Sequence, residues 1–526
     1  MQNFLLILDR HPRWAALILG LGAAMGFPPL ALWPLAMAAL AGFAWLVWRS
    51  ASWKQAAGLG WLFGVAHFTL ANNWIATAFT FQAEMPAELG WAAVPLLSLY
   101  LAVFPAIGCG LAKALAPKAS LAGFAPMLGA GWIVGEWLRS WVFTGYAWAP
   151  LSLLLVGPYD RPGAAAALPL AGSYALSGLL LAFGALLAAL IATRRWLLAA
   201  ALCALLAGGM FWPAPAPRPG TLPFTLVQPN LRQNEINDPS KFESVFQRLA
   251  ALSRPNRETP RRLMLWPESA VPDYLEPNYP QRYYDEATAG RDPALARARL
   301  GQIGGEGAML LAGTVNLRIG ASDAGTPAAT GAYNSIVAIG PRGRIAGRYD
   351  KAHLVPYGEY LPMRALLEPL GLSRLVAGSI DFLAGPGPRT IDLGAWGAAG
   401  MQICYEIVFS GEVVDSSNRP DYIFNPSNDG WFGSWGPPQH LAQARMRAIE
   451  EGLPVLRSTT TGISAVIDAR GVVRDHIGKD RAARIDGLVP PALAPTPFAR
   501  IGHWLTAIWA VLLAAVSLVA SRRARR

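Results

Sequence analysis

The chain has 526 residues, of which 53% are hydrophobic and only 15% are charged, a composition that excludes an ordinary soluble globular protein. Much of the basic excess behind the formal net charge of +11 flanks apolar segments, where it orients helices in a bilayer, so we exclude a nucleic-acid partner. The 6 histidines and 3 cysteines form no pair at metal-ligand spacing, so the sequence predicts neither a metal site nor a cofactor.

Long apolar stretches fill the first part of the chain, residues 1–213, and one more follows near the C-terminus. Each is long enough to cross the hydrocarbon core of a bilayer, which is about 30 Å thick. We place eight transmembrane helices at about 12–27, 30–48, 57–79, 88–115, 122–143, 165–192, 195–213 and 502–520. Residues 501–526 contain the eighth helix and a basic tail.

The Lys and Arg residues between these helices fall almost entirely on one side of the membrane if the eight helices alternate in direction. This basic set comprises Arg10, Arg13, Arg49, Lys54, Lys113, Lys118, Arg194, Arg195, Arg522, Arg523, Arg525 and Arg526. The opposite side has only Arg139 and Arg161. The positive-inside rule therefore places both termini in the cytoplasm and the polar region before the last helix outside it.

A proline-rich linker, residues 213–220, separates the helices from this polar region. Beyond it, short β-type runs alternate with helical stretches at about 239–253, 292–303 and 437–452. The predicted strands are Leu222–Gln228, Leu263–Trp266, Ala308–Val315, Ser335–Ile339, Met401–Cys404, Tyr422–Asn425, Pro454–Ser458 and Ser464–Asp468. Because such strands interleave with helices, we expect residues 214–500 to form an α/β domain with α-β-β-α layers.

Three residues with reactive side chains, Glu268, Lys351 and Cys404, stand at the ends of predominantly apolar runs. Taken singly, Glu268 and Lys351 could be solvated, and Cys404 could be a core cysteine, because unpaired Cys is often buried. Cys404 is the only cysteine of the polar region, since Cys109 and Cys203 lie in apolar segments. Together the three residues supply the thiol, the base and the cation that a cysteine nucleophile needs.

These three groups suit acyl transfer. A free thiol has a pKa of about 8.5 and needs a base or a nearby cation to react at neutral pH. We expect Glu268 to take the thiol proton as a general base and later to transfer the proton of an incoming amine. Lys351 and the backbone N–H of Tyr405 would stabilise the oxyanion of the tetrahedral intermediate.

The motifs around these residues carry a resemblance to a known family. They are Trp-Pro-Glu at Glu268, Lys-Ala-His-Leu-Val-Pro-Tyr-Gly-Glu from Lys351, Cys-Tyr-Glu from Cys404, Asn428-Asp429-Gly430-Trp431-Phe432-Gly433 and Arg445-Met446-Arg447-Ala448. The first three resemble the Glu-Lys-Cys triad of the nitrilase superfamily, and with eight spans the chain resembles the bacterial apolipoprotein N-acyltransferases. The resemblance implies a multi-pass protein of the bacterial inner membrane with a periplasmic nitrilase-like catalytic domain.

The same resemblance implies a two-step reaction. Cys404 would take an acyl chain from a membrane phospholipid as a thioester and pass it to the α-amino group of the diacylglyceryl-cysteine of an apolipoprotein. We expect a monomer. The nearest alternative is a membrane-tethered nitrilase-type amidohydrolase, in which water resolves the acyl-enzyme. A transporter or receptor would require the three reactive groups to be a coincidence.

The family pattern also points to residues around the triad. We expect Glu359, Tyr405 and Glu406 to support the site, and their plain alternatives are a surface carboxylate, a core aromatic residue and a buried structural acid. Asn334 and Trp431 are weaker candidates for substrate binding.

Two stretches of the polar region are candidate lids. Val271–Pro280 is aromatic and rich in turn residues, and Leu361–Leu383 presents several leucines, including Leu366, Leu367 and Leu370. Ordinary packing on the domain is the alternative. We expect some of these leucines to enter the outer leaflet and admit an acyl chain, because each methylene that leaves lipid for water costs about 0.8 kcal/mol.

Overall fold

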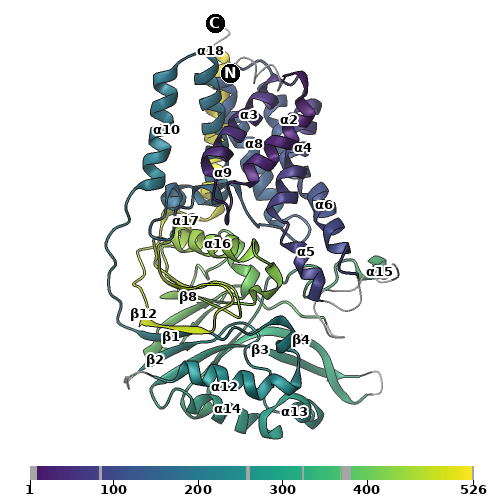
Figure 1. Ribbon diagram of the computed structural model, residues 1–526, viewed down its shortest axis with the longest axis vertical. Helices are drawn as coiled ribbons and strands as arrows, with labels where there is room; N and C mark the ends of the chain where they lie inside the picture. Colours follow the sequence, from purple (N-terminus) through teal and green to yellow (C-terminus); the bar gives the residue numbers. More distant parts are fainter. Residues whose placement is uncertain are drawn as a thin grey trace.

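The computed structural model describes residues 9–81, 86–255, 261–322, 325–367, 369 and 381–523. It has two parts stacked end to end, a helical bundle and, beneath it in Figure 1, a layered α/β domain. The described ends of the chain both lie at the end of the bundle that is remote from the sheets (Figure 1).

The bundle is built from apolar helices of unequal length. They are α2 (Pro12–Ala24), α3 (Trp33–Arg49), α4 (Trp53–Ala71), α5 (Ile75–Ala78), α6 (Leu89–Leu101), α7 (Val103–Leu115), α8 (Leu121–Trp141), α9 (Leu168–Ala192), α10 (Trp196–Phe211), α17 (Pro497–Ile501) and α18 (His503–Arg523). Within the described ranges, 4 helical segments are long and apolar enough to cross a membrane, namely Leu89–Leu115, Leu121–Trp141, Ala164–Ala192 and His503–Arg522.

One expected helix, at about 57–79, is interrupted. Helix α4 ends at Ala71, and the short helix α5 begins only at Ile75. Near the end of α4, Asn73 Nδ2 donates to the carbonyl oxygen of Leu70 at 2.8 Å. Asparagine side chains compete with the backbone for hydrogen bonds in this way, which explains why the helix stops inside an apolar stretch.

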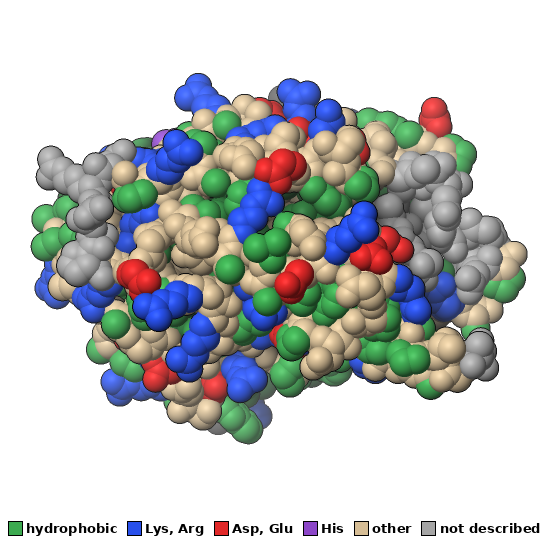
Figure 2. Space-filling model, turned by 90° about the horizontal axis from the view of Figure 1, so that it is seen from below, with side chains coloured by type: hydrophobic (Ala, Val, Ile, Leu, Met, Phe, Trp, Pro, Cys, Tyr) green, Lys and Arg blue, Asp and Glu red, His purple; other side chains and the backbone are tan. Residues whose placement is uncertain are grey.

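Large apolar side chains point outward from the bundle. Trp14 is 69% exposed, Leu197 88% and Trp504 77%. Exposed apolar surface of this kind marks contact with a membrane or a partner. The face of the domain turned away from the bundle differs, because Lys, Arg, Asp and Glu side chains are scattered over it (Figure 2). The bundle surface therefore suits lipid, and the far face of the domain suits water.

Two 6-stranded sheets form the centre of the domain, with the orders β12-β1-β2-β3-β4-β5 and β11-β10-β9-β8-β7-β6. The strands are β1 (Pro223–Gln228), β2 (Arg262–Leu265), β3 (Ala308–Ala321), β4 (Pro327–Ile339), β5 (Ile345–Asp350), β6 (Thr390–Asp392), β7 (Ala398–Met401), β8 (Tyr422–Ser427), β9 (Val455–Thr459), β10 (Ser464–Ile467), β11 (Val473–Ile477) and β12 (Ala483–Leu488). Strands β1, β2 and β3 run parallel in the first sheet, as do β7, β8 and β9 in the second.

Helices cover the outer faces of both sheets and so produce α-β-β-α layers. Helices α12 (Phe242–Ser253) and α14 (Pro293–Gln302) cover the first sheet, and α16 (Gly436–Glu451) lies between the second sheet and the bundle (Figure 1). The sheets face each other, since Ser458 Oγ in β9 donates to the carbonyl oxygen of Val227 in β1 at 2.7 Å. The other described α-helices of the domain are α11 (Gln233–Ile236), α13 (Gln281–Ala287) and α15 (Arg364–Leu367).

The structure adds four strands that the apolar pattern did not reveal, β5, β6, β11 and β12. Strand β11 has the sequence Val-Arg-Asp-His-Ile, and β12 has the sequence Ala-Arg-Ile-Asp-Gly-Leu. Each of these two strands lies at the outer edge of its sheet. Edge strands tolerate charged residues because one side of the strand has no neighbour in the sheet, so their apolar signal is weak.

Helix α16 joins the domain to the bundle through polar contacts. Gln439 Oε1 accepts from Trp148 Nε1 at 2.8 Å, and Gln443 Oε1 accepts from the backbone N–H of Ala149 at 3.0 Å. Arg445 is buried and donates to four carbonyl oxygens, those of Gly157, Pro158, Arg161 and Gly471. Apart from the bond to Gly471, which lies between β10 and β11, these bonds attach the segment that follows α8 directly to α16.

Candidate active site

Cys404 begins a short 3-10 turn after β7, which ends at Met401. The expected strand Met401–Cys404 is therefore wrong beyond its first residue. The φ angle of Cys404 is +51°, a left-handed conformation that a strand cannot contain. For a residue other than glycine, such a conformation costs about 1–3 kcal/mol and persists only where the surroundings fix it.

Glu268 follows strand β2, and its side chain is buried. Oε1 accepts from Asn334 Nδ2 at 2.7 Å, and Oε2 accepts from the backbone N–H of Asn428 at 2.7 Å. Burial raises the pKa of Glu268, the Lys351 cation opposes this shift, and the Glu359 carboxylate adds to it. A carboxylate whose pKa is raised toward neutrality suits the work of a general base.

Lys351 follows strand β5 and is 1% exposed. Its Nζ lies 2.9 Å from Glu359 Oε2 and 3.9 Å from Glu268 Oε1. Asn334 Nδ2 bridges the same two carboxylates, because it also donates to Glu359 Oε1 at 2.8 Å. Burial alone would lower the pKa of Lys351, but the carboxylates of Glu359 and Glu268 raise it above its ordinary value. The ammonium group is therefore charged, and two carboxylates share it.

The thiol of Cys404 lies within electrostatic reach of both groups. Burial raises the pKa of this thiol, the Glu268 carboxylate raises it further, and the Lys351 cation lowers it. The net shift is upward, so the resting thiol is protonated and needs a base before it can attack. The tertiary structure thus gathers Glu268, Lys351 and Cys404, from the ends of three strands, into one buried cluster.

Glu406 connects the turn of Cys404 to the turn of Lys351. Its Oε1 accepts from Tyr349 Oη at 2.8 Å and from the backbone N–H groups of Ala352 and His353 at 2.7 and 3.1 Å. Its Oε2 accepts from the backbone N–H of Ile403 at 2.7 Å. Burial raises the pKa of Glu406 to about 7. This carboxyl group therefore connects the turn of Cys404 to the turn of Lys351.

Two aromatic residues connect the site to the bundle side. Tyr405 stacks against Trp148, with ring centroids 6.5 Å apart. Trp431 is half-buried and meets Phe81 edge to face, with centroids 5.7 Å apart. The hydroxyl of Tyr405 is buried and has no hydrogen-bond partner among the described residues. The turn that carries the nucleophile therefore lies against residues of the membrane part.

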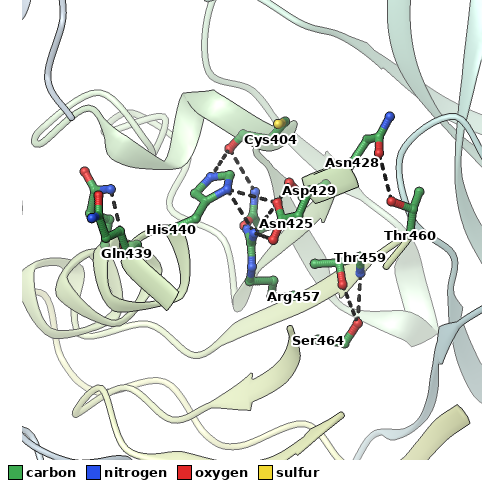
Figure 3. A network of polar contacts seen from close by, with 12 residues as sticks. Cys404, Asn425, Asn428, Asp429, Gln439, His440, Arg457, Thr459, Thr460 and Ser464 are labelled. Atoms are coloured by element: carbon green, nitrogen blue, oxygen red, sulfur yellow. Dashed lines mark hydrogen bonds and ion pairs between the residues drawn. The ribbon is translucent and has the colours of Figure 1, made fainter. Parts of the chain in front are cut away.

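A buried polar cluster that the sequence analysis missed lies behind Cys404 (Figure 3). It consists of Asn425 in β8, Asp429 after β8, His440 in α16 and Arg457 in β9. Arg457 Nη2 lies 2.8 Å from each carboxylate oxygen of Asp429. Burial alone would raise the pKa of Asp429, but the Arg457 cation holds it well below its usual range. The signals in the sequence were Asp429, which lies in one of the family motifs, and an arginine inside the otherwise uncharged run that forms β9.

Of the two candidate lids, Val271–Pro280 is fully described and Leu361–Leu383 only in part. Leu366 is 62% exposed, but the side chain of Leu367 and all of Leu370 lie outside the described residues, as do Leu372, Leu375 and Val376. The other stretch packs on the domain, because Tyr279 Oη accepts from the backbone N–H of Leu317 in β3 at 3.0 Å. Contact of the leucines of Leu361–Leu383 with the outer leaflet stays a prediction.

Comparisons with known proteins cover nearly the whole chain. Residues 19–186 match the family described as apolipoprotein N-acyltransferase N-terminal domain, and residues 226–481 match the carbon-nitrogen hydrolase family. The apolipoprotein N-acyltransferase of Rhodopseudomonas palustris is 34% identical, over 96% of this chain and 95% of that protein. The proteins of that name from Bradyrhizobium diazoefficiens and Sinorhizobium fredii are 35% and 32% identical, over 97% and 95% of this chain and 94% of each relative.

Proposed function

Since this chain belongs to the apolipoprotein N-acyltransferase family, we propose that it moves an acyl chain from a membrane phospholipid to the N-terminal amino group of an apolipoprotein. The buried cluster of Glu268, Lys351 and Cys404 is the observation that supports one particular site for this reaction. This cluster lies beside aromatic residues of the membrane part, where a lipid donor would arrive.

The first half-reaction forms a thioester on Cys404. As Sγ attacks the ester carbonyl carbon of the phospholipid, Glu268 takes the thiol proton. Lys351, with the backbone N–H of Tyr405, stabilises the oxyanion of the tetrahedral intermediate. The C–O bond of the ester then breaks, and the departing alkoxide of the lysophospholipid takes the proton from Glu268. The acyl chain remains on sulfur.

The second half-reaction moves the acyl chain to nitrogen. The α-amino group of the diacylglyceryl-cysteine attacks the thioester carbonyl carbon, and Glu268 takes a proton from that nitrogen. The C–S bond breaks, an amide forms, and the proton returns to the thiolate of Cys404. Glu359 and Asn334 support these proton transfers by holding Lys351 and Glu268 in place. Trp431, which contacts Phe81 of the membrane part, is a candidate contact for substrate.

The arrangement of the chain in the membrane follows from the same proposal. Residues 1–213 and 501–526 supply about eight spans, and residues 214–500 form a catalytic domain in the periplasm with both termini in the cytoplasm. Three observations support this topology: the basic residues between the helices, the position of the described chain ends remote from the domain, and the outward-facing apolar side chains of the bundle. One chain supplies every residue of the triad, which fits a monomer.

The test is mass spectrometry of the peptide that contains Cys404 after incubation of the purified protein with phospholipid alone. We expect the mass of one acyl chain on that peptide and its loss in Cys404→Ala. Cys203, an exposed cysteine of helix α10, is the matched control. Cys203→Ala should leave the thioester unchanged.

The second step separates acyl transfer from the alternative amidohydrolase. Addition of a diacylglyceryl-cysteine peptide should convert the thioester to an N-acyl peptide, whereas a hydrolase would release free fatty acid at the same rate with or without the peptide. Absence of acyl label on Cys404, or its persistence in Cys404→Ala, would contradict the proposed site.

A further inference from the structure

The backbone carbonyl oxygen of Cys404 is held from the interior of the domain by two side chains. His440 Nε2 lies 3.1 Å from this oxygen, and Asn425 Nδ2 donates to it at 3.4 Å. A carbonyl oxygen only accepts hydrogen bonds, so the hydrogen of the His440 ring is assigned to Nε2. Figure 3 shows both side chains directed at the Cys404 backbone.

The other end of the same peptide unit points the opposite way. In a trans peptide the C=O and the following N–H are antiparallel and lie in one plane. Bonds that hold the carbonyl oxygen of Cys404 toward His440 therefore direct the N–H of Tyr405 away from His440. No acceptor in the described part of the chain contacts that N–H. A donor that is left unpaired and held in a fixed direction is what an oxyanion requires.

His440 is itself held rigidly. It is 0% exposed, and its Nδ1 lies 3.0 Å from Arg457 Nη2 and 3.1 Å from Asp429 Oδ1. Burial lowers the pKa of His440, and the Arg457 cation lowers it further, so the ring is neutral and Nδ1 accepts from Arg457. Ser427 Oγ fixes Asp429 in turn, donating to Oδ1 at 2.7 Å. Every polar atom of the imidazole ring is thus engaged.

We propose that His440 is a positioning residue, which fixes the Cys404–Tyr405 peptide through the Cys404 carbonyl oxygen and so aims the Tyr405 N–H at the oxyanion. This inference rests on the proposed acyl transfer, in which an oxyanion forms on the attacked carbonyl. His440 touches neither substrate nor sulfur in this role. It also accounts for the left-handed backbone of Cys404, because the bonds from His440 and Asn425 hold that residue in a conformation it would otherwise leave.

The experiment compares two reactions of the same thiol. Acylation of Cys404 by phospholipid passes through an oxyanion, whereas alkylation by iodoacetamide displaces iodide from carbon and forms none. Loss of one oxyanion donor costs about 10²–10³ in rate. In His440→Leu we therefore expect the acylation rate to fall by about 10² while the alkylation rate changes less than about threefold. His440→Gln should recover most of the acylation rate, because its amide nitrogen can donate to the same oxygen.

Leu441→Ala is the control for a purely structural effect. Leu441 is buried on the same helix, and its truncation should lower the unfolding temperature without changing the ratio of acylation to alkylation. A ratio in His440→Leu equal to that of the unsubstituted protein, an equal fall in Leu441→Ala, or no recovery in His440→Gln would overturn the proposal. Absence of acylation in the unsubstituted protein would instead contradict the proposed function, so the two failures are distinct.

Discussion

The Glu406→Gln substitution tests whether acylation requires the hydrogen bonds by which Glu406 connects the turn of Cys404 to the turn of Lys351. Glu406 accepts four hydrogen bonds, three on Oε1 and one on Oε2. In the glutamine variant, the side-chain oxygen can keep the three donors of Oε1. The new amide nitrogen then faces the backbone N–H of Ile403, which loses its acceptor.

The structure sets the size of the expected effect. A buried N–H left without an acceptor costs about 1–3 kcal/mol. If about 2 kcal/mol of this cost is added to the activation free energy of acylation, the rate falls by about 30-fold, since about 1.4 kcal/mol corresponds to a factor of ten. The effect should appear in the rate of thioester formation on Cys404, measured by mass spectrometry in a single turnover.

Glu451→Gln is the matched control. Both carboxyl groups are buried, and burial raises the pKa of Glu406 and of Glu451 to about 7. Glu451 lies 11 residues beyond His440 on α16, about 16 Å along the helix. Normal acylation in Glu406→Gln, or an equal loss in Glu451→Gln, would refute a positioning role for Glu406.

Three further predictions follow from the buried charges. Lys351→Met should abolish acylation and lower the unfolding temperature, because two buried carboxylates lose their shared cation. An inactive variant whose unfolding temperature is unchanged would contradict the shared ion pair. The acylation rate should rise with pH through the raised pKa of Glu268, since only the ionised form is a base, and a rate independent of pH between 4 and 8 would exclude that base. The ordinary pKa of Glu406 is 4.5, and burial raises it to about 7 in the folded protein, so the unfolded chain ionises first as the pH rises. The contribution of Glu406 to the free energy of unfolding should therefore fall between these two pH values, and Glu406→Gln should flatten this slope.

Much of the candidate site could be predicted from local patterns. Glu268 and Cys404 follow the apolar runs that form β2 and β7, whereas Lys351 follows β5, a strand with the charged residues Arg348 and Asp350 that was not predicted. Each also lies in a motif with a recognisable order of residues. The sequence predicted an α/β domain but not the order of its strands, such as β7, β8 and β9 side by side, because strand order depends on contacts between distant parts of the chain.

The cluster behind Cys404 could not be predicted in the same way. His440 lies in the second turn of α16 and Arg457 in the middle of β9, where a polar residue usually faces solvent. Only the packing of α16 on the second sheet turns both side chains inward, to Asp429 and to the Cys404 carbonyl oxygen. The expected strand through Cys404 was wrong for a related reason: those contacts hold its backbone in a left-handed conformation.

The amino-acid sequence by itself determined which segments are apolar helices, where most of the short apolar strands lie, and which residues could act as nucleophile, cation and base. These properties depend on the hydropathy and charge of neighbouring residues, so they can be read along the chain. Only the tertiary structure decided that Lys351 is shared by Glu268 and Glu359, and that His440 supports the peptide after the nucleophile. Such contacts depend on distances of a few ångströms between residues far apart in sequence, which local patterns do not specify.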